Sequence, residues 1–192
     1  MPPNSTKLWE EGAVFKSFRI VENNIFNEKA TVEAFNYPAK YPGCSGSRNL
    51  SDNISDLKAQ IAANKKGIDL INQLIDEYGL NVVLSYMKHI QNTAESSVRT
   101  LLKNISNKTR NDEEFSVFEA QEYLDNGSNI DICITINKKN GEATFDFSGT
   151  GYQVNGNLNT PGAITLSAII YCIRCMLKHD IPLNQVTNFL SN

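Results

Sequence analysis

Residues 42–60 read Pro42-Gly-Cys-Ser-Gly-Ser-Arg-Asn-Leu-Ser-Asp-Asn-Ile-Ser-Asp-Leu-Lys-Ala-Gln60, and the fold is decided where this stretch changes character. Its first part is rich in Pro, Gly and Ser, which favour turns, so it is predicted to be a loop. From Leu50 onward, apolar side chains recur at steps of three, four and seven and therefore share one face of a helix. They are Leu50, Ile54, Leu57, Ile61, Ile68, Ile71 and Ile75. We predict a long amphipathic helix over residues 51–78 that Gly79 ends.

A second long helix is predicted directly after the first. Asn81 can cap its start, and apolar residues at helical spacing continue as far as Ile105. They are Val83, Met87, Ile90, Ala94, Val98, Leu101 and Ile105. Because only about three residues connect the two helices, we expect a long antiparallel αα-hairpin over residues 50–105.

Three strands are predicted to follow, at about residues 114–124, 129–137 and 142–147. In the middle strand, isoleucines at alternate positions face one way and polar side chains face the other. Residues 125–128 and 138–141 are rich in Asp, Asn and Gly, which is typical of hairpin turns. The strands are therefore expected to form an antiparallel β-meander with one solvated face.

The first 49 residues are predicted to be an arm of strand and loop. Residues 13–21 are rich in β-branched and aromatic side chains and indicate a strand. Asn23-Asn24 indicates a turn, after which Ile25-Phe26 is expected to pair briefly. A short helix is expected at residues 28–36, because the residue before Pro38 is disfavoured in helical conformation.

A last helix is predicted over residues 161–178, with Thr160 at its cap and Pro161 at its first position. Because it is apolar nearly all round, we expect it to be buried, in a larger body than this chain supplies. The meander and this helix together occupy residues 114–178. The expected fold is therefore α+β, and it is an incomplete part of a larger domain.

The composition argues against several classes of function. The 192 residues carry a net charge of −3 and no basic stripe interleaved with aromatic residues, so nucleic-acid binding has little support. No apolar run approaches the roughly 20 residues of a membrane span. Residues 1–7 lack the apolar stretch of a signal peptide. With four cysteines and no secretory signal, we expect a reducing, cytosolic location.

The cysteines and histidines do not indicate a metal site. Cys172 and Cys175 have the spacing of a metal-binding pair, but no second pair of Cys or His accompanies them at ligand spacing. They lie inside an apolar helical run, so we expect them to be buried or packed against neighbouring helices. His89 and His179 are expected to have structural or surface roles.

Polar residues at the start of the first long helix are one candidate site. Asp52 and Asp56 are four residues apart and so lie on one side of the helix, near the positive end of its dipole. Arg48 and Asn49 precede them. One interpretation is a solvated face that complements the dipole. The other is a site in which Arg48 binds a substrate carboxylate while Asp52 or Asp56 handles a proton or positions a water.

A second candidate is the glycine-rich segment Asp146-Phe-Ser-Gly-Thr-Gly151 at the end of a predicted strand. Its glycines permit close approach of a ligand to main-chain N–H groups, beside Ser148 and Thr150. Three amides follow just before a helix N-terminus, at Asn155, Asn157 and Asn159. These amides can either hydrogen-bond a polar ligand or tie down a long loop.

Several separated blocks, taken in order, carry a resemblance to a known family. They are residues 42–60, 62–67, 87–95, 146–151, 156–161 and 181–185. From Met1 to about Gln185 the chain resembles the hydantoinase B/oxoprolinase family, and within it most closely the eukaryotic 5-oxoprolinases. The resemblance places Arg48, Asn49, Asp52 and the loop through Asn159 in motif blocks.

The resemblance implies ATP-dependent ring opening of 5-oxo-L-proline to L-glutamate, in the glutathione cycle. In the complete enzyme a hydantoinase A-like part phosphorylates the lactam, and the part that this chain resembles contributes the hydrolytic step. ATP, a divalent metal and a homo-oligomer are expected of that complete enzyme, and no cofactor site of this chain itself.

Departures from the family pattern limit what this chain is expected to do. The ATP-handling part and a His-rich segment of metal-binding type are missing, and residues 186–192 leave the pattern. We therefore expect a fragment of the hydrolytic half that is inactive alone. One alternative is a non-catalytic assembly module that pairs with a full-length paralogue. Another is a hydantoinase or acetone carboxylase-type subunit.

Overall fold

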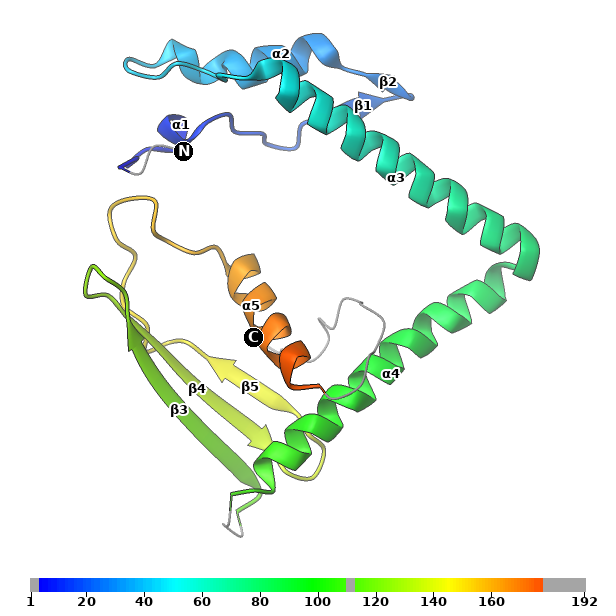
Figure 1. The fold of residues 1–192 in the computed structure, drawn as a ribbon, viewed down its shortest axis with the longest axis vertical. Helices are drawn as coiled ribbons and strands as arrows, with labels where there is room; N and C mark the ends of the chain where they lie inside the picture. The colour runs from blue at the N-terminus through cyan, green and yellow to red at the C-terminus, as the bar shows by residue number, and fades with distance from the viewer. Residues whose placement is uncertain (1–3, 110–112, 178–192) are drawn as a thin grey trace. The chain divides into compact units, whose positions relative to one another are not determined.

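The computed structural model describes residues 4–109 and 113–177. The chain divides into two compact units, which are drawn in Figure 1 and described separately below. The first unit comprises Met1–Glu77 and Val154–Asn159, and the second comprises Tyr78–Gln153 and Thr160–Asn192.

The arm of the first unit is more helical than the sequence predicts. Its elements are α1 (Leu8–Glu11), β1 (Val21–Glu22), β2 (Ile25–Phe26), α2 (Glu28–Asn36) and the 3-10 helix η1 (Tyr37–Lys40). The helix at 28–36 and the Asn23-Asn24 turn are confirmed, and both turn asparagines have the positive φ that a tight hairpin requires. The strand at 13–21 is wrong, because only Val21 is extended and paired. Ser17 has a φ of 47°, which interrupts any extended run.

Aromatic contacts hold this arm together in place of the expected sheet. The ring of Phe15 meets that of Phe35 edge-on, with centroids 5.3 Å apart. Trp9 stacks on Tyr41 at 4.7 Å. Such pairs add about 0.5–1.5 kcal/mol each beyond their burial, which gives a short, loop-rich segment a defined shape.

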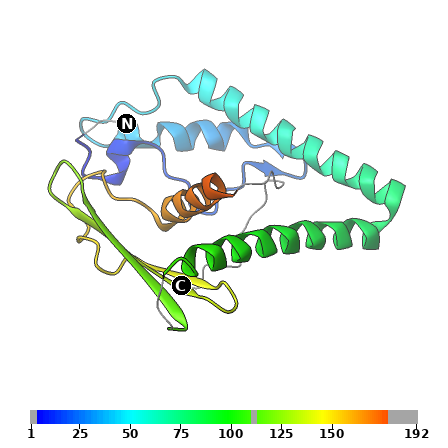
Figure 2. The same cartoon turned by 60° about the horizontal axis from the view of Figure 1, so that its bottom comes forward.

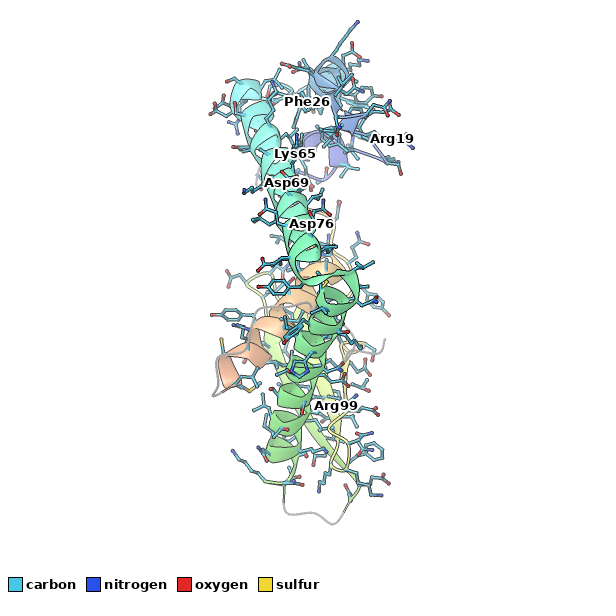
Figure 3. All side chains as sticks on the ribbon, turned by 90° about the vertical axis from the view of Figure 1, so that its right-hand side faces the viewer. Arg19, Phe26, Lys65, Asp69, Asp76 and Arg99 are labelled. Atoms are coloured by element: carbon cyan, nitrogen blue, oxygen red, sulfur yellow. The ribbon has the colours of Figure 1, made fainter. Side chains whose placement is uncertain are left out.

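The first long helix is confirmed as α3 (Leu50–Tyr78). Its expected apolar face is buried only at the start, where Ile54 packs inside the first unit. Farther along the same face, Ile68 is 62% exposed and Ile71 is 38% exposed. Figure 3 shows the polar side chains of Lys65, Asp69 and Asp76 along the same helix.

The second long helix is confirmed as α4 (Leu80–Ser106), which follows Gly79 at a φ of 84°. Its buried residues are Val83, Ala94, Val98, Leu102 and Ser106, the last four at intervals of four. This spacing places them along one side of the helix. Since α3 and α4 belong to different units, the antiparallel packing of a hairpin stays a prediction.

The predicted meander is confirmed. β3 (Phe115–Tyr123), β4 (Asn129–Asn137) and β5 (Ala143–Asp146) pair antiparallel in the order β3-β4-β5. On one face Ile136 lies opposite Ser116 on β3 and Ala143 on β5. This face packs against α4, where Val98 and Leu102 join Ile136 and Ala143 in the buried core (Figure 2).

The turn between β4 and β5 docks closely against α4. Gly141 has a φ of +71°, and a Cβ atom built on it would lie 2.5 Å from the carbonyl oxygen of Arg99. The Arg99 side chain, labelled in Figure 3, pairs with Glu95 at 3.0 Å and donates to the carbonyl of Asn140 at 3.2 Å. Glycine is therefore required both by the backbone conformation and by the contact.

The last helix is confirmed as α5 (Gly162–Met176), with Pro161 rather than Thr160 at its cap. Its predicted burial is wrong for this chain, because no residue of α5 is buried. Ile173 and the following Leu177 pack against the core, whereas the opposite side is open. Cys172 and Cys175 lie on that open side and are exposed, which corrects the expectation of packed thiols. None of the helices in the described ranges is long and apolar enough to cross a membrane.

Candidate functional site

The loop before α3 is tied to the first turn of the helix. Gly43 and Gly46 adopt positive φ, so the chain turns sharply before it enters the helix. The side-chain amide of Asn53 donates to the hydroxyl oxygen of Ser47 at 2.5 Å. The backbone N–H of Asn53 donates to the carbonyl of Asn49 at 3.2 Å and starts the helix. The position of Arg48 and Asn49 is thus set by α3 itself.

Three polar side chains form a hydrogen-bonded group at this helix start, which we call the α3 cluster: Asn49, Ser51 and Asp52. The Asn49 amide donates to Oδ2 of Asp52. The Ser51 hydroxyl donates to the side-chain oxygen Oδ1 of Asn49 at 3.3 Å and lies 3.5 Å from Oδ1 of Asp52. The Asp52 carboxylate is therefore held in one orientation while it remains exposed.

Arg48 and Asp56 lie on either side of the α3 cluster in sequence and form no hydrogen bond with its described residues. Both are exposed, and neither forms a hydrogen bond or an ion pair with the residues that the structure describes. A guanidinium of this kind can receive a carboxylate through two parallel hydrogen bonds. The arrangement is chemically able to bind an anionic group beside a fixed carboxylate.

The glycine-rich segment forms a turn after β5 in the second unit, which we call the β5 turn (residues 146–151). The backbone N–H of Ser148 donates to Oδ1 of Asp146 at 2.8 Å. This bond and one from the Ser148 side chain lower the pKa of Asp146, because they stabilise the ionised carboxylate. The backbone N–H of Thr150 closes the turn on the carbonyl of Phe147 at 2.9 Å.

The β5 turn continues the pairing of β5 along the edge of β4. The Thr150 hydroxyl accepts from the N–H of Asp131 and donates to its carbonyl, both at 3.1 Å, as a neighbouring strand would. The N–H of Gly151 then donates to the carbonyl of Asn129 at 3.0 Å, and the Asn129 amide donates to the carbonyl of Gly149 at 2.9 Å. The Thr150 hydroxyl therefore both donates and accepts a hydrogen bond within the fold.

The glycines of this turn are required by close contact with β4. A Cβ atom on Gly149 would lie 2.9 Å from Oδ2 of Asp131, and one on Gly151 would lie 3.0 Å from Oδ1 of Asn129. Oδ1 of Asp131 is buried without a hydrogen-bond partner among the residues described. Sequence reasoning missed Asn129 and Asp131. The available signal was their place on the polar side of an alternating strand.

The asparagines predicted to bind a ligand lie in a loop of the first unit. Asn159 accepts from the N–H of Val154 at 2.9 Å and donates to the carbonyls of Val154 and Gly156. Asn157 donates to the hydroxyl of Ser5 at 3.3 Å. Asn155 is exposed and shows no hydrogen bond within the described ranges. Asn159 thus ties down the loop, and a ligand role for the three amides stays a prediction.

Over residues 4–109 and 113–177, no three side chains of His, Cys, Asp or Glu are placed to hold a metal ion together. His179 lies outside these residues. The β5 turn lacks the Gly-Lys-Ser/Thr sequence that cradles nucleotide phosphates.

Comparison with known proteins gives a consistent result. The sequence profile described as "Hydantoinase B/oxoprolinase" matches residues 1–187. The chain is 45% identical to 5-oxoprolinase 1 of Arabidopsis thaliana, over 96% of this chain and 15% of that relative. It is 48% identical to the 5-oxoprolinase of Saccharomyces cerevisiae and 49% identical to that of Dictyostelium discoideum, in each case over 96% of this chain and 14% of the relative. The chain thus spans about a seventh of the length of these relatives, and no solved structure matches it.

Proposed function

Because the chain belongs to the hydantoinase B/oxoprolinase family, we propose that it is a segment of the hydrolytic half of an ATP-dependent 5-oxoprolinase. That enzyme opens 5-oxo-L-proline to L-glutamate. The observation that carries the proposal is identity of 45% and 48% to two 5-oxoprolinases along 96% of the chain. The four free cysteines suit the cytosol, where we place the protein.

The α3 cluster is the part of the site that we propose for chemistry. Arg48 binds the substrate carboxylate, and Asp52 positions a water or accepts its proton. The Asn49 amide holds Asp52 in place, and Asp56 is the second carboxylate within reach of the same face. Asn155, whose side chain is exposed and without a hydrogen bond among the described residues, is a further substrate-binding residue that we propose. Thr150, Asn157 and Asn159 already form hydrogen bonds within the fold, and a binding role for them and for Ser148 stays a prediction.

We propose that ATP and a divalent metal are bound in the complete enzyme. We also propose that the complete enzyme is a homo-oligomer. There a hydantoinase A-like part, on the same polypeptide or on a paralogue, phosphorylates the lactam. The residues of this chain orient the substrate and the attacking water.

The first experiment asks whether the chain acts alone. We expect no ATP-dependent glutamate release when the purified chain is mixed with 5-oxoproline and ATP, with or without divalent metal. Robust turnover that survives removal of contaminating enzymes contradicts the proposed dependence on the missing parts.

A chimera tests the assigned function itself. Residues 1–187 replace the matching segment of the Saccharomyces cerevisiae 5-oxoprolinase, and ATP-dependent glutamate release is measured. We expect the chimera to be active. A chimera that is folded and hydrolyses ATP but releases no glutamate argues against a 5-oxoprolinase segment.

Variants of the chimera test the α3 cluster and the neighbouring Arg48. Asp52→Asn is expected to lower kcat by roughly 100-fold or more, since general acid–base groups contribute about 10²–10⁴-fold. Arg48→Lys is expected to raise KM, because lysine loses the two-point contact with a carboxylate. Lys65→Ala, an exposed change farther along α3, is the control. Wild-type kinetics for Asp52→Asn contradict the assigned site.

A second candidate function is assembly without catalysis. Exposed apolar side chains on α3, and separately on α5, favour it, because exposed apolar patches mark interfaces. In this proposal the chain binds a full-length paralogue. Co-migration with a full-length 5-oxoprolinase in size-exclusion chromatography supports it, and a monomer that ignores that protein contradicts it. Activity of the chimera on hydantoins in place of 5-oxoproline would favour a hydantoinase or acetone carboxylase-type subunit.

A further inference from the structure

The open side of α5 gathers three sulfur atoms that the proposed function does not use. Cys172 and Cys175 are free and exposed, and Met176 is 47% exposed. Residues three and four apart are neighbours on a helix surface, so Cys172 lies beside both Cys175 and Met176. Two thiols and one thioether therefore lie within one turn at the C-terminal end of α5.

The spacing of Cys172 and Cys175 favours a metal ion bound between their sulfur atoms over a disulfide bond. Helical neighbours have Cβ atoms about 5–6 Å apart. A disulfide needs Cβ atoms about 3.5–4.5 Å apart, so the two cysteines cannot close one without distorting the helix. Metal–sulfur bonds of about 2.3 Å let a single ion span two sulfurs that are about 4 Å apart.

The donor set selects a soft ion. Borderline zinc takes four ligands in a structural site, and within the described parts of the chain no third His, Cys, Asp or Glu joins this pair. Thiolate and thioether ligands together are the preference of Cu(I).

We propose that Cys172, Cys175 and Met176 form a binding site for one soft monovalent metal ion, of which Cu(I) is the type. On binding, each thiol loses its proton to solvent and forms a sulfur–metal bond, and the Met176 thioether adds a neutral third ligand. No electron is transferred, since the ion enters and stays monovalent.

The test is a titration of the whole, reduced chain with Cu(I) in competition with a chromophoric Cu(I) chelator. We expect one ion per chain to be withdrawn from the chelator. Cys172→Ser and Cys175→Ser are each expected to abolish this withdrawal. Met176→Leu is expected to weaken the affinity by roughly tenfold, because it removes one sulfur and keeps the shape of the side chain.

Two controls make the test decisive. Cys44→Ser and Cys133→Ser remove the other thiols and are expected to leave the stoichiometry and affinity unchanged. Far-ultraviolet circular dichroism checks that each variant keeps its helices. The site is overturned if Cys172→Ser still withdraws one ion, if the Cys44 or Cys133 variant loses it, or if the wild-type chain leaves all Cu(I) with the chelator.

Discussion

The two long helices carry the same kind of apolar stripe, yet they use it differently. In the second half of α4, Ala94, Val98 and Leu102 are buried, and the latter two pack against the sheet, whereas Met87 and Ile90 nearer its start are exposed. In α3 only Ile54 is buried, and Ile68 and Ile71 of its stripe are exposed. A stripe arises from residues near one another in sequence, whereas burial needs a partner surface. The difference separates the part of the fold that this chain completes from the part that it leaves uncovered.

Truncating one apolar side chain on each stripe should give the largest contrast. Leu102→Ala is expected to lower the stability of the second unit by about 2–5 kcal/mol, because it leaves a cavity in the core. Ile68→Ala on α3 is expected to change stability by less than about 0.5 kcal/mol, since this side chain is already 62% exposed. Hydrogen exchange of α4 and β4 amides measures the first effect. Equal effects would show that the α3 stripe is covered.

The turn that docks on α4 should be the next most sensitive point. Gly141→Ala is expected to cost about 1–3 kcal/mol from its positive φ, and more from the clash with the Arg99 carbonyl. Gly127→Ala is the matched control, because Gly127 also has a positive φ but no neighbour within 4 Å. Chemical denaturation followed by circular dichroism compares the two. If both variants lose the same stability, the close approach to α4 contributes nothing.

Thr150→Val should have a smaller effect in the same unit. It keeps the shape of the side chain and removes both hydrogen bonds to the Asp131 backbone. A loss of about 1–3 kcal/mol is expected, at about 0.5–1.5 kcal/mol for each of the two bonds. Thr144→Val on β5 is the control. Faster exchange of the Asp131 amide in Thr150→Val alone would identify the lost contact.

The smallest expected effect is the loss of stability at low pH that follows from protonation of Asp146. Hydrogen bonds from Ser148 lower the pKa of Asp146 in the folded chain, so its contribution to stability is present above the unfolded value of about 3.9. That contribution is lost as the pH falls through the lower, folded value. A nuclear magnetic resonance titration of the Asp146 carboxyl carbon should therefore give a midpoint below about 3.9. A midpoint at or above that value contradicts the turn geometry.

Much of the fold could be predicted because its signals are local. Apolar periodicity identified α3, α4 and α5, and Asn- and Gly-rich turns identified the strands between them. The strand at 13–21 failed because the ring of Phe15 packs against Phe18 and Phe35, and because a strand needs a partner, which here only Val21 finds.

The candidate site was less predictable, because it depends on which polar groups are already used. Spacing placed Asp52 at the start of a helix, but only the structure shows that Asn49 donates to its carboxylate. In the sequence, Thr150 and Asn159 were both candidates for binding a ligand. The structure shows that the side chains of both form hydrogen bonds within the fold. The anchors Asn129 and Asp131 lie about 20 residues before the turn they hold. Strand alternation placed them on a polar face, but only the tertiary pairing shows that they contact the turn.

The sequence by itself determined the order of the long helices and the strands between them, the turn chemistry and, through its ordered blocks, the family. These depend on backbone preferences and side-chain periodicity, which act over a few residues. Only the tertiary structure decided which stripe is buried, why Gly141 and Gly149 must be glycine, and which polar groups remain free. Those properties arise from contacts between segments that are distant in sequence, and the free energy of such contacts depends on the partner as much as on the residue.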